Sequence, residues 1–285
     1  MNSGFLLIDK PKDWTSRDVC NKIQSILKNK KVGHCGTLDP FATGLLIVAV
    51  GNATKALSFL EDFTKEYVAI LSLGKKTDTG DLTGNVIEQK EVPAFTNENL
   101  SEVCVNLIGK SQQIPPMTSA IKINGTKLYE LAHKGIEISR EPRDIEIFSM
   151  SMMRSNANEI IFKTNVSKGT YIRTLGETIA EKLNTVGYLT DLRRTKINEI
   201  KVEDAIKIEN VDETKLISVT GVLSKFINPV RVSDELVTKI KNGVALDCTL
   251  LKSNSNQVLL IDGANNALAV YNKKKDKYFC ERGLW

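Results

Sequence analysis

The chain is poor in the residues that build metal and redox centres. Among 285 residues there are two histidines and five cysteines, and the cysteines are odd in number, scattered and free of any CxxC pair. This composition argues against a zinc site and a disulfide framework, and it favours reduced thiols in the cytoplasm. Cys35 has His34 beside it in sequence only, so we do not interpret it as a catalytic nucleophile.

Long apolar runs are missing as well. No stretch approaches the ~20 apolar residues of a membrane-spanning helix, and the N-terminal residues MNSG carry neither the basic nor the apolar part of an export signal. The sequence also lacks G-x-G-x-x-G, a strict strand–helix–strand repeat and any low-complexity tract. We therefore expect a cytoplasmic protein without a dinucleotide-binding fold, a membrane partner or a bound metal.

The remaining composition is that of an ordinary globular protein. Hydrophobic residues make up 41% and charged residues 26%, and the length suits one large domain or a large and a small one. The net charge is +5 and the pI is near 8.8. A mildly basic chain is suited to an acidic partner such as nucleic acid, although this value alone does not identify one.

Most of the chemistry is concentrated in residues 33–44, GHCGTLDPFATG. The glycines allow tight turns, and the apolar residues 45–50 that follow read as a buried strand, so a carboxylate and a histidine are expected on a loop anchored in the core. Two interpretations of Asp39 remain open: a catalytic carboxylate, or the N-cap of a helix whose first residue is Pro40. For His34 the two interpretations are a structural hydrogen-bonding group and a ligand.

Periodicity predicts an α+β fold with a mixed, mostly antiparallel sheet flanked by helices. Thr15 and Asp18 form a capping box for the first helix, and Asn52 is the expected cap of a short helix reaching Leu60. If the strand near residue 166 continues, Tyr171 and Arg173 face the same side. The other expected strands are 5–8, 67–73, 160–166, 188–192, 258–261 and 267–271, and the other helices are centred on 100–107, 128–134 and 175–183.

Two regions stand apart from this pattern. Residues 111–144 contain Pro115-Pro116, a turn at Asn124-Gly125, a short helix closed by Gly135, and scattered cations, which suits either a hinged lid or an ordinary surface subdomain. A linker near residues 210–229 leads to a small C-terminal unit with two strands and the basic run 273–275. That unit is suited either to RNA binding or to a solubilising surface hairpin.

Four motifs in order resemble those of the TruB family, the bacterial tRNA pseudouridine-55 synthases. The first is the loop 33–44, and the resemblance extends from about Gly4 to about Val211. The other three motifs are Lys65-Glu66-Tyr67 with Leu73-Gly74 and Thr77-Asp78-Thr79-Gly80-Asp81, then Ser167-Lys168-Gly169-Thr170-Tyr171-Ile172-Arg173-Thr174, then Leu192-Arg193-Arg194-Thr195. The run 77–81 lacks the ligand spacing of a calcium loop.

The resemblance implies a pseudouridine synthase fold and an isomerase that acts without cofactor or metal. Its implied partner is the T arm of tRNA, where it converts uridine 55 to pseudouridine, and a monomer is expected. The implied domains are a catalytic domain over 1–229 with the 111–144 insertion closing on RNA, and a reduced PUA-like RNA-binding domain over 230–285.

The resemblance also assigns roles to individual residues. Asp39 is implied as the nucleophile, Arg173 as its orienting partner, and Tyr67 as a ring that stacks on the base and a candidate for proton transfer. Implied substrate-binding residues are His34, which would hold the flipped state, Tyr67, Tyr171 and Leu192. Without the resemblance, Tyr67 reads as a core or rim residue and Leu192 as core. For Arg173 a surface cation and a partner of Asp39 both remain open.

Two other functions fit the same sequence. A tRNA-binding folding factor would need the basic C-terminal unit and the insertion but no charge at position 39. A pseudouridine synthase with another RNA target would need the same catalytic residues, and the short N-terminus argues against guide-RNA-dependent relatives by family analogy.

Overall fold

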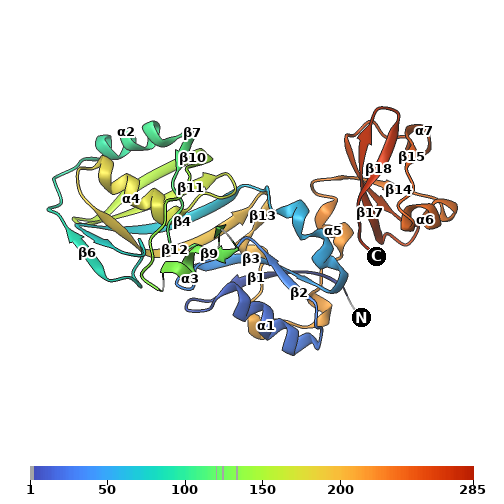
Figure 1. The fold of residues 1–285 in the computed structure, drawn as a ribbon, viewed down its shortest axis with the longest axis horizontal. Coiled ribbons are helices and arrows are strands. Elements are labelled where there is room, and N and C mark those ends of the chain that lie inside the picture. The colour runs from blue at the N-terminus through green and yellow to red at the C-terminus, as the bar shows by residue number, and fades with distance from the viewer. Residues whose placement is uncertain (1–2, 120, 124, 133) are drawn as a thin grey trace. The chain divides into compact units, whose positions relative to one another are not determined.

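The computed structural model describes residues 3–285 except 120, 124 and 133, and the chain forms two compact units (Figure 1). The first unit comprises Met1–Pro40, Leu46–Glu61 and Glu203–Trp285, and the second comprises Phe41–Leu45 and Asp62–Val202. These bounds differ from the expected division after residue 229. The chain beyond residue 202 returns to the N-terminal strand, where Phe5 bridges Ile217 and Ile8 bridges Ile206.

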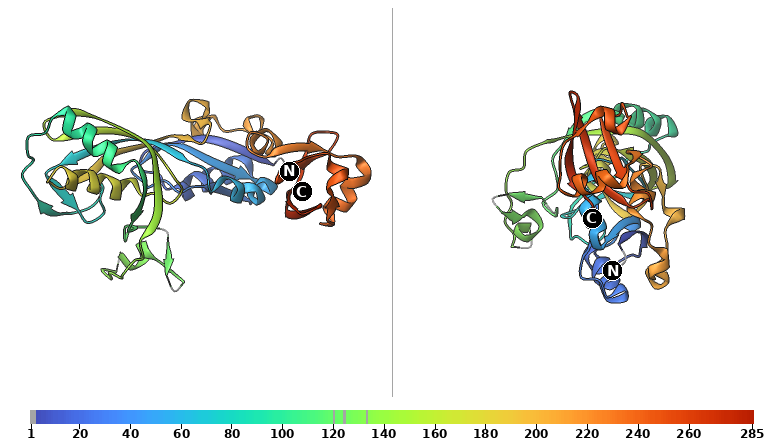
Figure 2. Two further views of the ribbon diagram at one scale, coloured as in Figure 1. Left: turned by 90° about the horizontal axis from the view of Figure 1, so that it is seen from above. Right: turned by 90° about the vertical axis from the view of Figure 1, so that its right-hand side faces the viewer.

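The second unit is built around an antiparallel sheet, with strand order β12-β4-β11-β10-β7, and the start of β3 pairs in parallel with β12. Helices α2 and α4 cover one face of this sheet (Figure 2). The elements are β4 (Lys65–Leu73), β5 (Lys75–Thr77), β6 (Val86–Gln89), α2 (Asn97–Leu107), β7 (Gly109–Gln113), β8 (Lys122–Ile123), β9 (Thr126–Lys127), α3 (Leu128–Ala132), β10 (Arg143–Asn156), β11 (Glu159–Val166), α4 (Ile172–Lys182), β12 (Gly187–Ile197) and β13 (Ile200–Lys201). The expected mostly antiparallel α+β arrangement is confirmed.

Strand β4 shows why the sequence forms this sheet. Every second residue is buried, including Tyr67, Ala69 and Leu71, while the residues between them are partly exposed. Helix α4 packs on the buried face at Gly176, where a Cβ atom would lie 2.9 Å from Leu189. Close contact between α4 and the sheet therefore requires a glycine at position 176. The alternation of buried and exposed residues that the sequence predicts for 67–73 is confirmed.

The N-terminal part of the first unit packs one helix against its strands. Its N-terminal part contains β1 (Gly4–Lys10), α1 (Ser16–Leu27), β2 (Val32–Cys35), β3 (Thr43–Val50) and the 3₁₀ helix η1 (Gly51–Leu60). The predicted capping box of α1 is present: the Thr15 hydroxyl accepts from the Asp18 N–H, and the Asp18 carboxylate accepts from the Thr15 N–H. Apolar residues of β1, α1 and β3, among them Ile8, Val19 and Val48, form one buried cluster.

Three expectations about local structure are wrong. Residues 33–35 lie in β2 and Thr43 in β3, so the loop spans only 36–42. Asn52 does not cap η1, which is a 3₁₀ helix that begins after Val50 without a side-chain cap. Residues 210–229 are not a plain linker, since they include the 3₁₀ helices η3 (Ile208–Asn210) and η4 (Glu213–Lys215), the helix α5 (Val219–Leu223) and the start of β14 (Asn228–Arg231).

The C-terminal part of the first unit has its own sheet, ordered β14-β16-β17-β18-β15. Its further elements are α6 (Asp234–Lys241), β15 (Leu246–Asp247), α7 (Cys248–Leu251), β16 (Gln257–Ile261), β17 (Ala267–Lys274) and β18 (Lys277–Gly283). Tyr271 and Tyr278 are fully buried in its core, and their hydroxyls donate to backbone carbonyls. The two predicted strands are confirmed, and because they belong to a packed sheet, the surface-hairpin alternative is wrong.

The insertion, defined here as residues 114–142, leaves and rejoins the second unit's sheet at one place, because Gln113 of β7 pairs with Arg143 of β10. It stands out from the sheet in Figure 2 and contains the β8–β9 hairpin and α3. Gly125 and Gly135 have φ of +84° and +69°, in agreement with the predicted turn and helix end, while Asn124 lies outside the described residues. Among the described residues, no helix is long and apolar enough to cross a membrane.

Candidate active site

Asp39 lies in the loop between β2 and β3, half-buried, and is followed by a turn at Pro40 rather than by a helix. The N-cap interpretation is therefore wrong. The loop is held from α1: the Leu38 N–H donates to the Ser16 hydroxyl at 2.9 Å, and that hydroxyl donates to the Leu38 carbonyl at 3.3 Å. Leu38 is itself buried, so the residue directly before Asp39 is fixed by packing and by hydrogen bonds.

A buried lysine that we did not predict supports the other side of the loop. The side chain of Lys10 has no exposed surface, and its ammonium donates to the carbonyls of Pro11 at 2.9 Å, Trp14 at 2.5 Å and Pro40 at 3.1 Å. The Pro40 carbonyl also accepts the Asp13 N–H at 2.8 Å. Because a buried ammonium must be hydrogen-bonded, this arrangement fixes the carbonyl of Pro40, the residue directly after Asp39. The sequence signal was a lysine at the end of an apolar strand.

Tyr67 and Leu192 lie on neighbouring strands of the second unit. Tyr67 of β4 pairs with Arg194 of β12, and Leu192 pairs with Ala69. Both predicted residues are buried, at 8% and 4% exposure. Arg194, to which we assigned no role, is 1% exposed and donates from Nε to the Leu45 carbonyl at 2.7 Å, so it fixes the start of β3 against β12.

Arg173 does not follow a strand. Strand β11 ends at Val166, and Arg173 lies in the first turn of α4, so the expectation that it shares a strand face with Tyr171 is wrong. It is 4% exposed, which excludes the surface-cation alternative. Nη1 donates to the Thr79 carbonyl at 2.8 Å and to the Thr118 hydroxyl at 2.6 Å, Nη2 donates to the Thr118 carbonyl at 2.9 Å, and Nη1 lies 3.4 Å from Asp81 Oδ2.

The motif at residues 77–81 forms the turn that carries Asp81 to Arg173. Asp81 is 4% exposed, and its Oδ1 accepts from the Thr79 hydroxyl at 2.9 Å, the Thr83 N–H at 2.9 Å and the Thr83 hydroxyl at 2.5 Å. Gly80, with φ of +72°, lets the turn pass close to α4, since a Cβ there would lie 3.4 Å from the Arg173 Cβ. A buried ion pair of this kind holds a guanidinium in one orientation.

Tyr171 is the half-buried N-cap of α4, and Gln113 fixes its backbone. The Tyr171 N–H donates to Gln113 Oε1 at 2.8 Å, and Gln113 Nε2 donates to the Tyr171 carbonyl at 3.1 Å. Gln113 is buried at the end of β7, immediately before the insertion. The predicted Tyr171, Arg173, Tyr67 and Leu192 therefore all belong to the second unit, and the insertion begins beside them.

His34 and Asp39 belong to the first unit. His34 lies in the middle of β2, half-buried and opposite Val48 of β3. The pairing of Asp39 with Arg173 remains a prediction, as do the catalytic and substrate-binding roles of all six residues.

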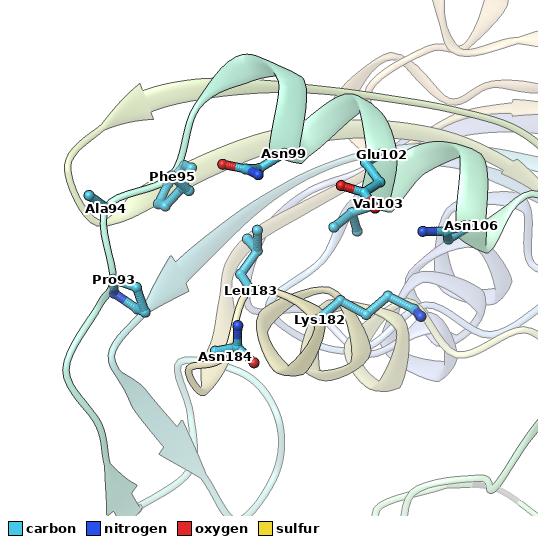
Figure 3. Close-up of a pocket in the computed structure, with 10 residues that line it drawn as sticks. All are labelled: Pro93, Ala94, Phe95, Asn99, Glu102, Val103, Asn106, Lys182, Leu183 and Asn184. Carbon is cyan, nitrogen blue, oxygen red and sulfur yellow. The ribbon is translucent and has the colours of Figure 1, made fainter.

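A hollow of about 310 Å³ lies between α2 and α4 at the end of α4 remote from Arg173 (Figure 3). Its floor includes Phe95, Val103 and Leu183, and Lys182 lies at its rim with several asparagines. None of the predicted site residues lines it, so we do not assign it to the chemistry.

Comparison with known proteins identifies a family model and several relatives of this chain. Residues 24–172 match the model of the TruB family pseudouridylate synthase N-terminal domain. The chain is 38% identical over 283 residues to tRNA pseudouridine synthase B of Bacillus cytotoxicus, covering 94% of this chain and 92% of that protein. It is 37% identical to the protein of the same name from Clostridium tetani, covering 97% of each, and 44% identical to that from Geotalea uraniireducens, covering 73% and 67%.

The fold has a solved counterpart. The structure described as a Cbf5-Nop10-Gar1 complex includes a chain that matches this one with a TM-score of 0.74 at 21% identity, covering 99% of this chain and 85% of that one. The predicted fold class is thereby confirmed, with the C-terminal sheet as its PUA-like part. From the family match and the identities together, the chain belongs to the TruB family of pseudouridylate synthases.

Proposed function

We propose that this chain acts on tRNA and isomerises uridine 55 of the T loop to pseudouridine, with Asp39 as the nucleophile. The substrate class is supported by the relatives, which are named tRNA pseudouridine synthase B. The observation that carries the chemistry is a buried arginine, Arg173, already held in one orientation by Asp81, Thr79 and Thr118.

The reaction breaks the bond between uracil N1 and ribose C1′, turns the base and joins C1′ to C5, so the proton leaves C5 and N1 regains one. The ribose that loses its base has oxocarbenium character, which a carboxylate stabilises or attacks, as in glycoside hydrolysis. Asp39 supplies that carboxylate from a loop in which the residues on both sides of it, Leu38 and Pro40, are hydrogen-bonded. An arginine carries five N–H donors, so one guanidinium is able to serve both Asp81 and Asp39.

The chain itself limits how far Asp39 is from the other residues. It precedes Thr43 by four residues, a span of at most about 14 Å when fully extended. Thr43 pairs with Arg193, and the next residue of β12, Arg194, pairs with Tyr67. We propose that Tyr67 stacks on the flipped uracil, that Tyr171 and Leu192 line the pocket, and that His34 helps to hold the flipped state.

The experiment is Asp39→Asn assayed on unmodified tRNA with mass-sensitive mapping of pseudouridine and no added cofactor. We expect turnover to fall at least about 1,000-fold, since the variant lacks the nucleophile, while tRNA binding persists. Asp13→Asn is the matched control, because Asp13 is exposed, close in sequence and has a φ of +65° that asparagine tolerates. Retained turnover in the Asp39 variant would reject Asp39 as the nucleophile. Pseudouridine formed at another uridine would reject uridine 55 as the target. A wild-type protein that binds tRNA without turnover would favour a folding factor.

A further inference from the structure

Thr118 of the insertion reaches the buried guanidinium of the second unit. Its hydroxyl accepts from Arg173 Nη1 at 2.6 Å and its carbonyl accepts from Arg173 Nη2 at 2.9 Å. Two charge-assisted hydrogen bonds on two different nitrogens fix the plane of a guanidinium, and Arg173 is almost fully buried, where such bonds are strong. The residue before the insertion, Gln113, holds the backbone of Tyr171 through two hydrogen bonds between neutral groups.

Thr118 is also tied to the rest of the insertion. The carbonyl of the next residue, Ser119, accepts the Tyr129 N–H of α3 at 3.1 Å, and the carbonyl of Ile121 accepts the Leu128 N–H at 2.8 Å. The returning arm is attached as well, since Arg140 Nη1 donates to the Pro115 carbonyl at 3.0 Å. A displacement of α3 would therefore be transmitted through Ser119 to Thr118 and from there to Arg173.

The outer part of the insertion is arranged to meet an anion. Lys122 and Lys127 are directly paired across the β8–β9 hairpin. Like charges opposite each other on an antiparallel pair destabilise it, and a bound phosphate would remove that cost. The Lys127 ammonium lies 3.2 Å from the Tyr129 hydroxyl, so this cation is in contact with α3.

We propose that Thr118 is a positioning residue that couples the insertion to Arg173. Phosphates bound by Lys122 and Lys127 hold α3 and its neighbours in place, and Thr118 then fixes the guanidinium that orients the catalytic carboxylate. The inference rests on the proposed function, because it assigns the insertion a polyanionic RNA and Arg173 a part in the reaction.

The first test is Thr118→Val, which keeps the shape and the backbone carbonyl but removes the hydroxyl. We expect the single-turnover rate constant at saturating tRNA to fall roughly tenfold or more, with the Kd for tRNA changed less than about twofold. Thr118→Ser restores the oxygen and is expected to recover most of the rate. An unchanged rate in the valine variant, or an equal loss in the serine variant, would overturn the proposal.

The second test asks whether the coupling exists. Replacing Lys122 and Lys127 by glutamine should weaken tRNA binding and lower the saturated rate in the wild type. The same change should lower the rate by a clearly smaller factor when Thr118 is already valine, because only the carbonyl contact with Arg173 then remains. Fully additive effects on the rate would contradict the coupling.

A third measurement does not depend on turnover. In NMR spectra, the side-chain nitrogen resonances of Arg173 are assigned by their loss in Arg173→Lys. These resonances should shift when a T-arm hairpin RNA is added to the wild type. The shift should be smaller in the Thr118→Val protein. If the wild type makes no pseudouridine, the proposed function fails, while this comparison still decides the role of Thr118. Equal shifts in the two proteins would reject that role.

Discussion

Glu177 is a carboxylate one helical turn beyond Arg173 on α4, where burial acts against its charge. Its Oε1 lies 3.7 Å from the Lys76 ammonium of β5. Burial is the largest influence and raises the pKa of Glu177, Glu181 raises it further, and Lys76 and Arg173 lower it, so that the net pKa lies above the ordinary 4.5. At pH values between 4.5 and the raised pKa of Glu177, the folded protein therefore binds a proton more readily than the unfolded chain does.

The consequence is a pH-dependent stability. The free energy of unfolding falls as pH rises through that window, and the penalty of the charge is fully present only above the raised pKa of Glu177. We expect Glu177→Gln to unfold at a higher temperature than the wild type at pH 7, with the difference shrinking as pH falls toward 4.5. Thermal unfolding against pH checks this, with Glu88→Gln as the control because Glu88 is an exposed carboxylate 3.0 Å from Lys90. A less stable glutamine variant at pH 7 would mean that the Lys76 pair outweighs burial.

The burial of three cationic side chains could not be predicted from the sequence. Lys10, Arg173 and Arg194 are all under 5% exposed. A lysine or arginine reads as a surface residue unless its partner is known, and each of these donates to backbone carbonyls, which are present at every position and leave no sequence signal. That Asp39 lies on a loop was predictable, because its glycines, its proline and the strand behind it all lie in one short stretch.

Strand β3 depends on a glycine at its start. Gly44 has a φ of +101°, and a Cβ atom there would lie 2.3 Å from the Arg194 carbonyl oxygen. We expect Gly44→Ala to lose about 3 kcal/mol or more of unfolding free energy, because both the backbone conformation and the parallel pairing with β12 are disturbed. Urea unfolding of the variant and the wild type measures this loss of unfolding free energy. Gly243→Ala is the control, since Gly243 has a φ of +68° and nothing within 4 Å, so about 1 kcal/mol is expected. Equal losses would show that the contact with Arg194 is unimportant.

The elements that the sequence predicted well are those whose signals are local. The capping box of α1, the alternation of β4 and the strands β16 and β17 each depend on residues a few positions apart. The expected continuation of β11 to Arg173 failed because Gly169, at φ +78°, lies in a turn and because the partner of Tyr171 is Gln113, 58 residues away. Contacts at that distance leave no periodic pattern.

The net charge of the chain is modest, at +5, so the placement of its charges matters more than their sum. Lys274 and Lys277 are directly opposite each other at the end of the β17–β18 hairpin, and both are exposed. This repeats the arrangement of Lys122 and Lys127 in the insertion. Two like-charged pairs on separate hairpins carry a folding cost that polyanion binding would offset.

The lysine pair of the C-terminal hairpin should affect the salt dependence of tRNA binding. Replacing Lys274 and Lys277 by glutamine should weaken tRNA binding and lower the slope of log K against log salt by about 1 to 2, since each phosphate contact contributes roughly 0.7 to 0.9. The same change should slightly stabilise the hairpin by removing the repulsion. Glutamine at Lys239 and Lys241 of α6 removes an equal charge from the same sheet's helix and is expected to lower the slope less. Because net charge is identical in the two double variants, equal slopes would mean that tRNA responds to total charge and not to the hairpin.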